Sequence, residues 1–330
     1  MGQSTTTPDI AGLQQSARQI QEQIGRVIVG KAETVELLLV ALFCNGHVLL
    51  EDVPGVGKTT LAKALARSLG CTFSRIQFTP DLLPSDITGV NVFNQQTGQF
   101  EYRAGPIMAQ IVLADEINRA GPRTQSALLE AMEERQVTVD GETRPLPYPF
   151  LVMATQNPVE LEGTFPLPEA QVDRFLMRVG IGYPQREEER QILRRFRADN
   201  PLERLTPLID TEALRQANLA CRQVHVHPVL EDYILDLTLG TRQHADVELG
   251  ASPRGSLALY RTSQALAALR GRAYVIPDDV QALAMPVLGH RLMLSADARL
   301  RGRKAAQVID RLVEQTPAPA EETWRTPAQA

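Results

Sequence analysis

The chain has 330 residues, of which 43% are hydrophobic, and carries a formal net charge of −5. This length and composition suffice to bury the core of one large domain or two smaller ones, and they exclude a largely disordered protein. The acidic balance, without any run of Lys and Arg, argues against a protein that acts on nucleic acid.

Cysteine usage and hydropathy favour a reducing compartment. The three cysteines, Cys44, Cys71 and Cys221, are far apart and form no CxxC pair, so neither a disulfide framework nor a zinc ribbon is expected. The longest apolar run, 37–44, is far shorter than the roughly 20 residues that a membrane span needs. The first residues lack the basic and apolar regions of a signal peptide. We therefore expect a cytoplasmic protein with no membrane span.

In chain order, apolar segments of strand length alternate with segments of helical periodicity up to about residue 184. The helical segments are 11–24, 32–44, 59–69 and 123–134. The strand-like segments are 47–51, 72–78, 111–115, 151–155 and 175–179. Short apolar strands separated by helices predict an α/β fold, in which helices cover both faces of a doubly wound parallel sheet. We assign this core to residues 9–190.

Two segments of the core alternate in polarity around a turn and are predicted to be inserted hairpins. The first lies at about 92–103 and turns at Thr97-Gly98, and the second lies at about 136–147 and turns at Asp140-Gly141. Neither hairpin belongs to a minimal doubly wound fold, so both are interpreted as additions to it.

After Pro184 the pattern becomes helical, with stretches such as 256–271 and 278–292 and no evident strand. The terminal segments are polar or rich in Pro, Ala and Glu, a composition that cannot bury a core. The expected organisation outside the core is a flexible tail at 1–8, a linker at 191–204, a small all-helical domain at 205–315 and a disordered tail at 316–330.

A glycine-rich segment follows the first strand and opens the next helix, which is the context of a phosphate-binding loop. Its residues are Pro54, Gly55, Val56, Gly57, Lys58, Thr59 and Thr60. The glycines let exposed backbone N–H groups approach phosphate oxygens. Lys58 is placed to reach the β- and γ-phosphates, and Thr59 to ligate Mg²⁺. Asp52 replaces the first glycine that this motif commonly has, and an ordinary glycine-rich turn is the alternative.

The strand at 111–115 ends in two adjacent acids, Asp115 and Glu116. In a parallel sheet the carboxyl ends of the strands line the ligand crevice. Asp115 is expected to hold Mg²⁺, and Glu116 to orient and deprotonate the attacking water. A helix N-cap with an acidic first turn is the alternative, and it explains one acid better than two. These residues together predict a site that binds ATP and Mg²⁺ and hydrolyses the nucleotide.

The strand at 151–155 is followed by Asn157. If this strand is the sheet neighbour of 111–115, Asn157 lies beside Glu116 and can hold the attacking water or the γ-phosphate. Taken alone, the same residues read as an ordinary turn.

Six motifs occur in a fixed order between roughly residues 20 and 310: EDVPGVGKT, LADEINRA, LLEAMEE, ATQNP, LPEAQVDRF and ASPR. Together they resemble the MoxR family of AAA+ ATPases. The resemblance implies an AAA+ core followed by a helical lid, assembled as a homohexamer. It also implies that Asn157 is the sensor-1 residue, that Arg174 is an arginine finger acting on a neighbouring subunit, and that Arg254 is the sensor-2 residue of the lid.

The role of Arg174 depends most on the resemblance. An arginine delivered to the γ-phosphate stabilises the charge of the transition state and is worth roughly 10³–10⁵ in rate in known examples. From the residues alone, an ion pair of Arg174 with Asp173 or Glu169 is the simpler interpretation. Arg119 and Arg123 are rival candidates for a contact in trans.

The function implied by the resemblance is ATP-driven, chaperone-like remodelling or maturation of a protein client, together with a partner that carries a von Willebrand factor A domain. We expect Phe93, Phe100 and Tyr102 of the first hairpin to grip the client, although packing on their own domain is an equal alternative. An ATPase subunit of a metal chelatase, a nucleic-acid motor and a non-enzymatic nucleotide switch are the rival functions.

Overall fold

The computed structural model describes residues 9–321 except 52, 54, 157–163 and 198–199. The chain forms two compact units. Among the described residues, the first unit comprises 19–175 and 179–212, and the second comprises 9–18, 176–178 and 213–321. The segment expected as a linker is not featureless, because it contains the end of α7 (Arg186–Arg195) and η3 (Pro201–Arg204), and it groups with the first unit.

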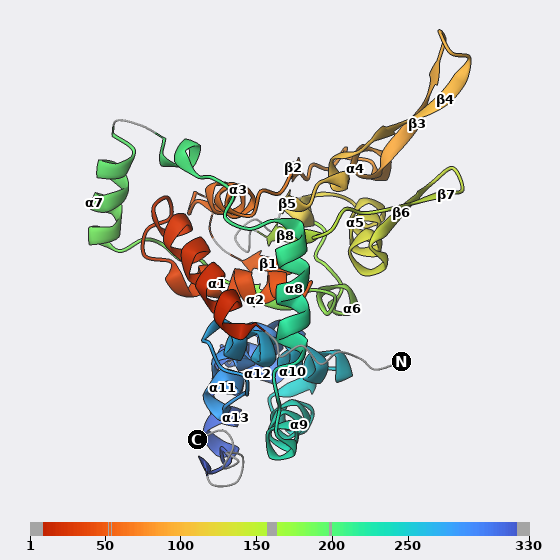
Figure 1. Cartoon of the computed structure of the whole chain (residues 1–330). Coiled ribbons are helices and arrows are strands. Elements are labelled where there is room, and N and C mark those ends of the chain that lie inside the picture. The colour runs from red at the N-terminus through yellow and green to blue at the C-terminus, as the bar shows by residue number, and fades with distance from the viewer. Residues whose placement is uncertain (1–8, 52, 54, 157–163, 198–199, 322–330) are drawn as a thin grey trace, which may run out of the picture. The chain divides into compact units, whose positions relative to one another are not determined.

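A five-stranded sheet forms the centre of the α/β core (Figure 1). Its order is β2-β5-β8-β1-β9, and the pairs β2/β5, β5/β8 and β1/β8 are parallel. The strands are β1 (Val48–Glu51), β2 (Phe73–Gln77), β5 (Ile111–Asp115), β8 (Leu151–Gln156) and β9 (Met177–Val179). All five strands predicted from apolar runs are therefore confirmed, and so is the parallel sheet.

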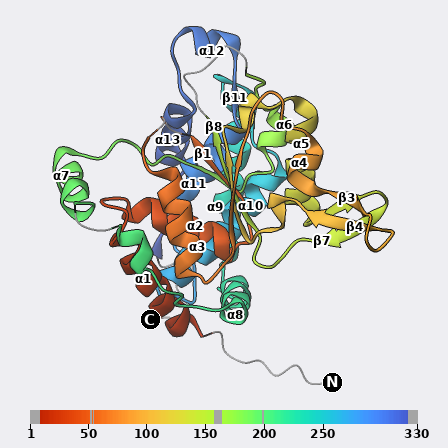
Figure 2. The same cartoon turned by 90° about the horizontal axis from the view of Figure 1, so that it is seen from above.

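Helices cover both faces of this sheet, as the sequence pattern predicted. Figure 2 shows α2 and α3 on one side of the sheet and α4 and α5 on the other. Val112, Ala114, Val152 and Ala154 point toward Leu128 and its neighbours on α5, because alternate residues of a strand face opposite sides. The helices up to residue 195 are α1 (Ile10–Gly25), α2 (Ala32–Phe43), α3 (Lys58–Ser68), α4 (Pro84–Thr88), α5 (Pro122–Glu134), α6 (Glu169–Val172) and α7.

Both predicted hairpins are present. The first pairs β3 (Gly89–Asn94) with β4 (Gln99–Ala104), and the second pairs β6 (Gln136–Val139) with β7 (Glu142–Pro145). In the second turn Asp140 and Gly141 have φ angles of 50° and 84°, the two consecutive positive values of a type I′ turn. The hairpins contact each other, since Asn91 Nδ2 donates to Asp140 Oδ2 at 2.8 Å.

The second unit is mainly helical but contains a small sheet that the sequence did not predict. The antiparallel strands β10 (Val247–Leu249) and β11 (Met293–Leu294) have three and two residues, too few to show the alternation that identifies a strand. The expectation of an all-helical domain is therefore corrected. Its helices are α8 (Thr211–Arg222), α9 (Pro228–Gln243), α10 (Pro253–Leu269), α11 (Pro277–Leu288), α12 (Ala296–Leu300) and α13 (Ala305–Gln315).

Across the described parts of the chain, none of the helices combines the length and apolar character that a bilayer span requires. Cys44, Cys71 and Cys221 are thiols rather than disulfide-bonded cysteines. Burial raises the pKa of Cys71 to about 11 and that of Cys221 to about 12, so both remain protonated at neutral pH.

Candidate functional site

Four strands of the sheet end at the same level, and this shared end defines the carboxyl edge of the sheet. Leu50 pairs with Thr155, Ala114 pairs with Ala154, and Gln77 pairs with Asp115. The turn that follows β1 and the two acids at the end of β5 therefore arise from one edge. In open parallel sheets this edge is where ligands bind, next to the strand at which the connections change direction.

The glycine-rich turn joins β1 to α3. Gly55 and Gly57 have φ angles of 86° and 91°, in the region that favours glycine, and the space where a side chain would stand is open at both positions. Gly57 is the N-cap of α3 and supplies no side chain to cap it, and a helix N-terminus of this kind attracts an anion. Pro54 lies outside the described residues.

Lys58, Thr59 and Thr60 form the first turn of α3, and each is partly buried. The ammonium and hydroxyl groups expected to hold phosphate and metal are thus carried by the helix end that attracts negative charge.

Both carboxylate oxygens of Asp115 accept hydrogen bonds. The Thr155 hydroxyl donates to Oδ1 at 2.6 Å, and Arg75 donates to Oδ2 through one terminal nitrogen at 2.6 Å and through Nε at 3.1 Å. The acid is thereby fixed between its two neighbouring strands, β2 and β8. Fixed carboxylate oxygens are the ligands that Mg²⁺ prefers in proteins.

Glu116 follows directly and has a left-handed backbone, with φ 58° and ψ 50°. Such a conformation is uncommon for a non-glycine residue and often marks a functional position. Its N–H donates to the Thr155 hydroxyl at 2.8 Å, while its Oε2 accepts from Gln77 Nε2 at 2.9 Å and from Arg119 at 3.0 Å. The two acids thus share Thr155, but their carboxylates have different further partners: Arg75 for Asp115, and Gln77 and Arg119 for Glu116.

The sequence analysis placed Asn157 beside Glu116 on the condition that the strand before Asn157 is the sheet neighbour of 111–115. This condition is met, because β8 is the parallel neighbour of β5. Asn157 itself lies outside the described residues. The residue that demonstrably joins the two strands is Thr155, which is only 1% exposed.

The three arginines considered for a contact in trans have different surroundings. Arg174 pairs through Nε with Glu133 at 2.8 Å, an acid near the end of α5 that the sequence analysis had not considered. Arg119 pairs with Glu116 of its own chain, and Arg123 is exposed at the start of α5. Arg254 is exposed at the start of α10 in the second unit, and its N–H donates to the capping hydroxyl of Ser252 at 3.1 Å.

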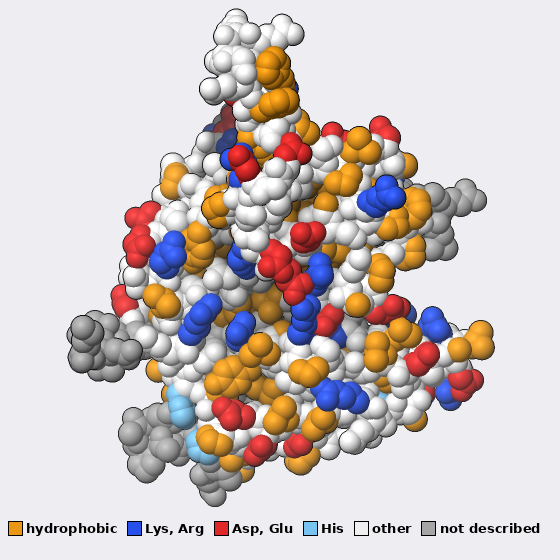
Figure 3. Space-filling view, turned by 90° about the vertical axis from the view of Figure 1, so that its right-hand side faces the viewer, with side chains coloured by type: hydrophobic (Ala, Val, Ile, Leu, Met, Phe, Trp, Pro, Cys, Tyr) orange, Lys and Arg blue, Asp and Glu red, His pale blue; other side chains and the backbone are white. Residues whose placement is uncertain are grey.

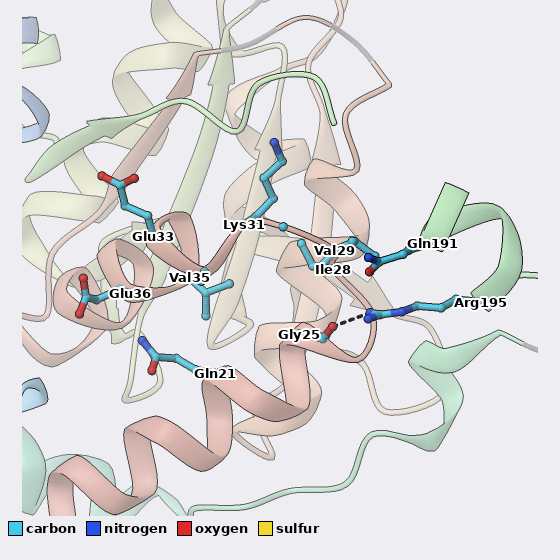
Figure 4. A pocket seen from close by; sticks show the side chains of 12 residues that line it. Gln21, Gly25, Ile28, Val29, Lys31, Glu33, Val35, Glu36, Gln191 and Arg195 are labelled. Atoms are coloured by element: carbon cyan, nitrogen blue, oxygen red, sulfur yellow. Dashed lines mark hydrogen bonds between the residues drawn. The ribbon is translucent and has the colours of Figure 1, made fainter. Parts of the chain in front are cut away.

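A cavity of about 510 Å³ opens in the first unit between the end of α1, the start of α2 and α7 (Figure 4). Ile28, Val29 and Val35 supply apolar lining. Arg195 closes one side by donating to the Gly25 carbonyl oxygen at 2.5 Å. A cavity of this size suits a small organic molecule with an apolar ring.

Sequence reasoning missed Arg75 and Gln77, which contact the acids from β2. They alternate with the buried Ile76, so the pattern indicated only that two polar side chains share one face of a strand. The strand order places β2 beside β5 and thereby brings both side chains next to the two acids.

Known proteins share both the sequence and the fold. Residues 47–177 match the ATPase family associated with various cellular activities (AAA), and residues 239–312 match the AAA lid domain. The chain is 53% identical to protein YeaC of Bacillus subtilis, covering 91% of this chain and 94% of that protein. It is 46% identical to chaperone MoxR1 of Mycobacterium tuberculosis, with coverage of 88% and 79%.

A solved structure agrees with these relatives. The structure of a candidate ATPase from Cytophaga hutchinsonii matches with a TM-score of 0.89 and 37% identity, over 94% of this chain and 97% of that one. With the glycine turn, the paired acids and the lid in the expected order, the chain belongs to the MoxR family of AAA+ ATPases.

Proposed function

We propose that this ATPase hydrolyses Mg²⁺-bound ATP at the carboxyl edge of the sheet and uses the energy to remodel or mature a protein client. The observation that carries the proposal is the single hydroxyl of Thr155 that contacts both Asp115 and Glu116. It holds a metal-binding acid and a candidate base side by side, beside the strand that leads into the glycine turn.

The residues present suit Mg²⁺. Asp115 offers a carboxylate whose orientation is fixed from both sides, and Thr59 offers a hydroxyl at the start of α3. Asp115 and Thr59 would hold the ion, which would supply positive charge next to the phosphates. The chain's own groups supply the rest: Lys58 and the amides of Gly55 to Lys58 bind the phosphates, and Glu116 orients the attacking water and accepts its proton.

We propose that the cavity beside α7 receives the nucleoside of ATP. Its volume and its apolar lining from Ile28, Val29 and Val35 suit an aromatic base, while Gln21 and Gln191 offer amide groups to the ring nitrogens. This cavity belongs to the same unit as the glycine turn.

Assembly as a homohexamer is also proposed, on the resemblance to ring-forming relatives. Arg174 would act as the finger on the neighbouring subunit's γ-phosphate, Asn157 as sensor 1 and Arg254 as sensor 2 from the lid. The side chain of Arg174 is 31% exposed, so a neighbouring subunit could reach it once the pair with Glu133 opens. We further propose a cytoplasmic location and a partner with a von Willebrand factor A domain.

The first hairpin is the proposed client-gripping element. Phe100 is 71% exposed and Phe93 is 51% exposed. Their rings pack edge to face, with 5.3 Å between the ring centroids. Figure 3 shows hydrophobic side chains on the flank of this hairpin, which projects at the top of the view. Exposed apolar side chains of this kind mark interaction surfaces. Tyr102 is less suited to gripping, because its hydroxyl donates to the Thr88 carbonyl oxygen at 2.5 Å and its ring lies against Arg144.

The decisive experiment compares nucleotide binding and turnover in two variants of the full chain. Lys58→Ala should weaken ATP binding about 100-fold or more, since it removes a charged phosphate ligand. Glu116→Gln should bind ATP normally but hydrolyse it about 100-fold more slowly or worse. Lys63→Ala is the matched control, because Lys63 is exposed on the same helix. Normal ATP affinity in Lys58→Ala would refute the assignment of the phosphate loop.

The client is best sought with the Glu116→Gln variant held in ATP, which should retain its bound protein during affinity capture. Phe100→Ala in the same background should release that protein while leaving nucleotide binding unchanged. Stimulation of the wild-type ATPase by DNA, or activity with a porphyrin and Mg²⁺ in a reconstituted mixture, would instead favour a nucleic-acid motor or a chelatase subunit.

A further inference from the structure

Asp115 already has a cationic partner at the position where it is expected to serve a metal. Arg75 donates two N–H groups to the same oxygen, Oδ2, at 2.6 and 3.1 Å. The Asp115 side chain is 17% exposed and that of Arg75 is 45% exposed. With Thr155 on Oδ1 at 2.6 Å, both oxygens of the acid are engaged.

Arg75 also reaches the second acid, through Gln77. Arg75 Nη2, which donates to Asp115, also donates to Gln77 Oε1 at 2.5 Å. Gln77 Nε2 in turn donates to Glu116 Oε2 at 2.9 Å. With its oxygen toward Arg75, the Gln77 amide must present its nitrogen to Glu116. Arg75 therefore fixes how both acids are held.

We propose that Arg75 is a positioning residue that occupies Asp115 until Mg²⁺ arrives, and so sets the Mg²⁺ concentration that nucleotide binding requires. The inference rests on the proposed function. A guanidinium at hydrogen-bond distance lowers the negative potential at the carboxylate and engages the lone pairs that would face a metal or its water. Arg75 must therefore leave Oδ2 before Asp115 can serve a metal, while Thr155 keeps Asp115 oriented through Oδ1.

The geometry requires arginine rather than any cation. Its planar fork places two N–H groups on Asp115 and one on Gln77 at the same time, whereas an ammonium is a compact point charge. Lysine at this position would keep the charge but lose part of the contact.

The test is a Mg²⁺ titration of the binding of fluorescently labelled ATP to the full-length protein. Arg75→Gln should lower the half-saturating Mg²⁺ concentration about three- to tenfold, because one charge-assisted contact no longer competes with the ion. Arg75→Lys should lie between this variant and the wild type. Arg190→Gln is the matched control, since Arg190 has a similar exposure of 46% in an ion pair with Glu187, and it should leave the titration unchanged.

A double variant separates competition from a general structural effect. In the Asp115→Asn background, Arg75→Gln should cause no further shift, because the competing contact has already lost its charge. An unchanged or raised half-saturating concentration in Arg75→Gln, with wild-type melting temperature, would overturn the inference alone. Failure of the wild type to bind labelled ATP at saturating Mg²⁺ would overturn the proposed function and this inference with it. If Arg75→Gln does not fold, Arg75→Lys decides between the same outcomes.

Discussion

The hydroxyl of Thr155 donates to Oδ1 of Asp115 at 2.6 Å and accepts the N–H of Glu116 at 2.8 Å. One buried side chain on β8 thus fixes both the carboxylate at the end of β5 and the left-handed backbone that follows it. Because a hydroxyl both donates and accepts, no apolar residue of the same shape can replace it.

Thr155→Val should lower kcat for ATP about 10- to 100-fold, because it leaves the partly buried Glu116 N–H without its acceptor and releases Asp115 Oδ1. Thr155→Ser keeps the hydroxyl and should stay within about threefold of the wild type. Steady-state ATPase rates at saturating Mg²⁺ and ATP measure both. Activity of Thr155→Val within about twofold of wild type would show that turnover does not depend on the hydrogen bonds of the Thr155 hydroxyl to Asp115 and Glu116.

Arg174 should be needed for turnover but not for ATP binding, because its proposed target is the nucleotide of another subunit. Arg174→Ala and Glu116→Gln should each be nearly inactive alone. Mixed subunits should regain part of the activity, since an intact Glu116 in one subunit then meets an intact Arg174 from the next.

Arg119 provides the comparison, because it pairs with Glu116 of its own chain at 3.0 Å. A mixture of Arg119→Ala with Glu116→Gln should show no more than the summed activities of its components. Rescue by Arg119 mixtures, and none by Arg174 mixtures, would move the trans contact to Arg119.

The sequence predicted the elements whose signals are local. The apolar run 111–115 became β5 without a change of boundary, and Asp140-Gly141 became the expected tight turn. Contacts between distant segments were not predictable in this way. The pairing of Arg174 with Glu133 depends on how α5 and α6 pack, and no pattern in either segment encodes it.

The contacts around the acids illustrate the same limit. Arg75 and Gln77 precede Asp115 by about 40 residues, and only the order of strands brings them together. The adjacency of β5 and β8, in contrast, was stated as a condition and is confirmed. The order of the strands in a parallel sheet is set by tertiary packing and by the crossover connections. A single sequence therefore indicates that order only through its resemblance to a known family.

A buried ion pair in the second unit should contribute strongly to stability. Asp279 is 0% exposed, accepts from two nitrogens of Arg272 at 2.6 and 2.7 Å, and caps α11 by accepting the Ile276 N–H at 3.1 Å. Asp279→Asn should lower the free energy of unfolding of this unit by about 2–4 kcal/mol, because it leaves Arg272 without its counter-charge. Chemical denaturation measures the change.

Asp297→Asn serves as the control for that measurement, because Asp297 pairs with Arg301 while its side chain remains 79% exposed. An exposed pair is worth about 0–1 kcal/mol, so this variant should unfold almost like the wild type. Equal effects of the two substitutions would mean that burial of Asp279 does not strengthen its pairing.

His47 should make the first unit less stable in mild acid. Its Nδ1 accepts the Val152 N–H at 3.0 Å, so its Nε2 carries the proton and donates to the Met132 carbonyl oxygen at 3.0 Å. Burial, and next the charge of Arg135, lower the pKa of His47 from 6.5 to about 3. Between these values the unfolded chain binds a proton that the folded chain does not, so falling pH favours unfolding.

The stability contributed by neutral His47 is therefore complete above pH 6.5 and is lost progressively as the pH falls toward 3. His47 alone should lower the free energy of unfolding by about 1.4 kcal/mol when the pH falls from about 7.5 to about 5.5. His47→Gln can make both hydrogen bonds but does not titrate, so its unfolding free energy should change less over the same interval. Urea denaturation of the nucleotide-free protein at the two pH values measures these changes. An equal loss of unfolding free energy in the wild type and in His47→Gln would assign the acid sensitivity to other groups.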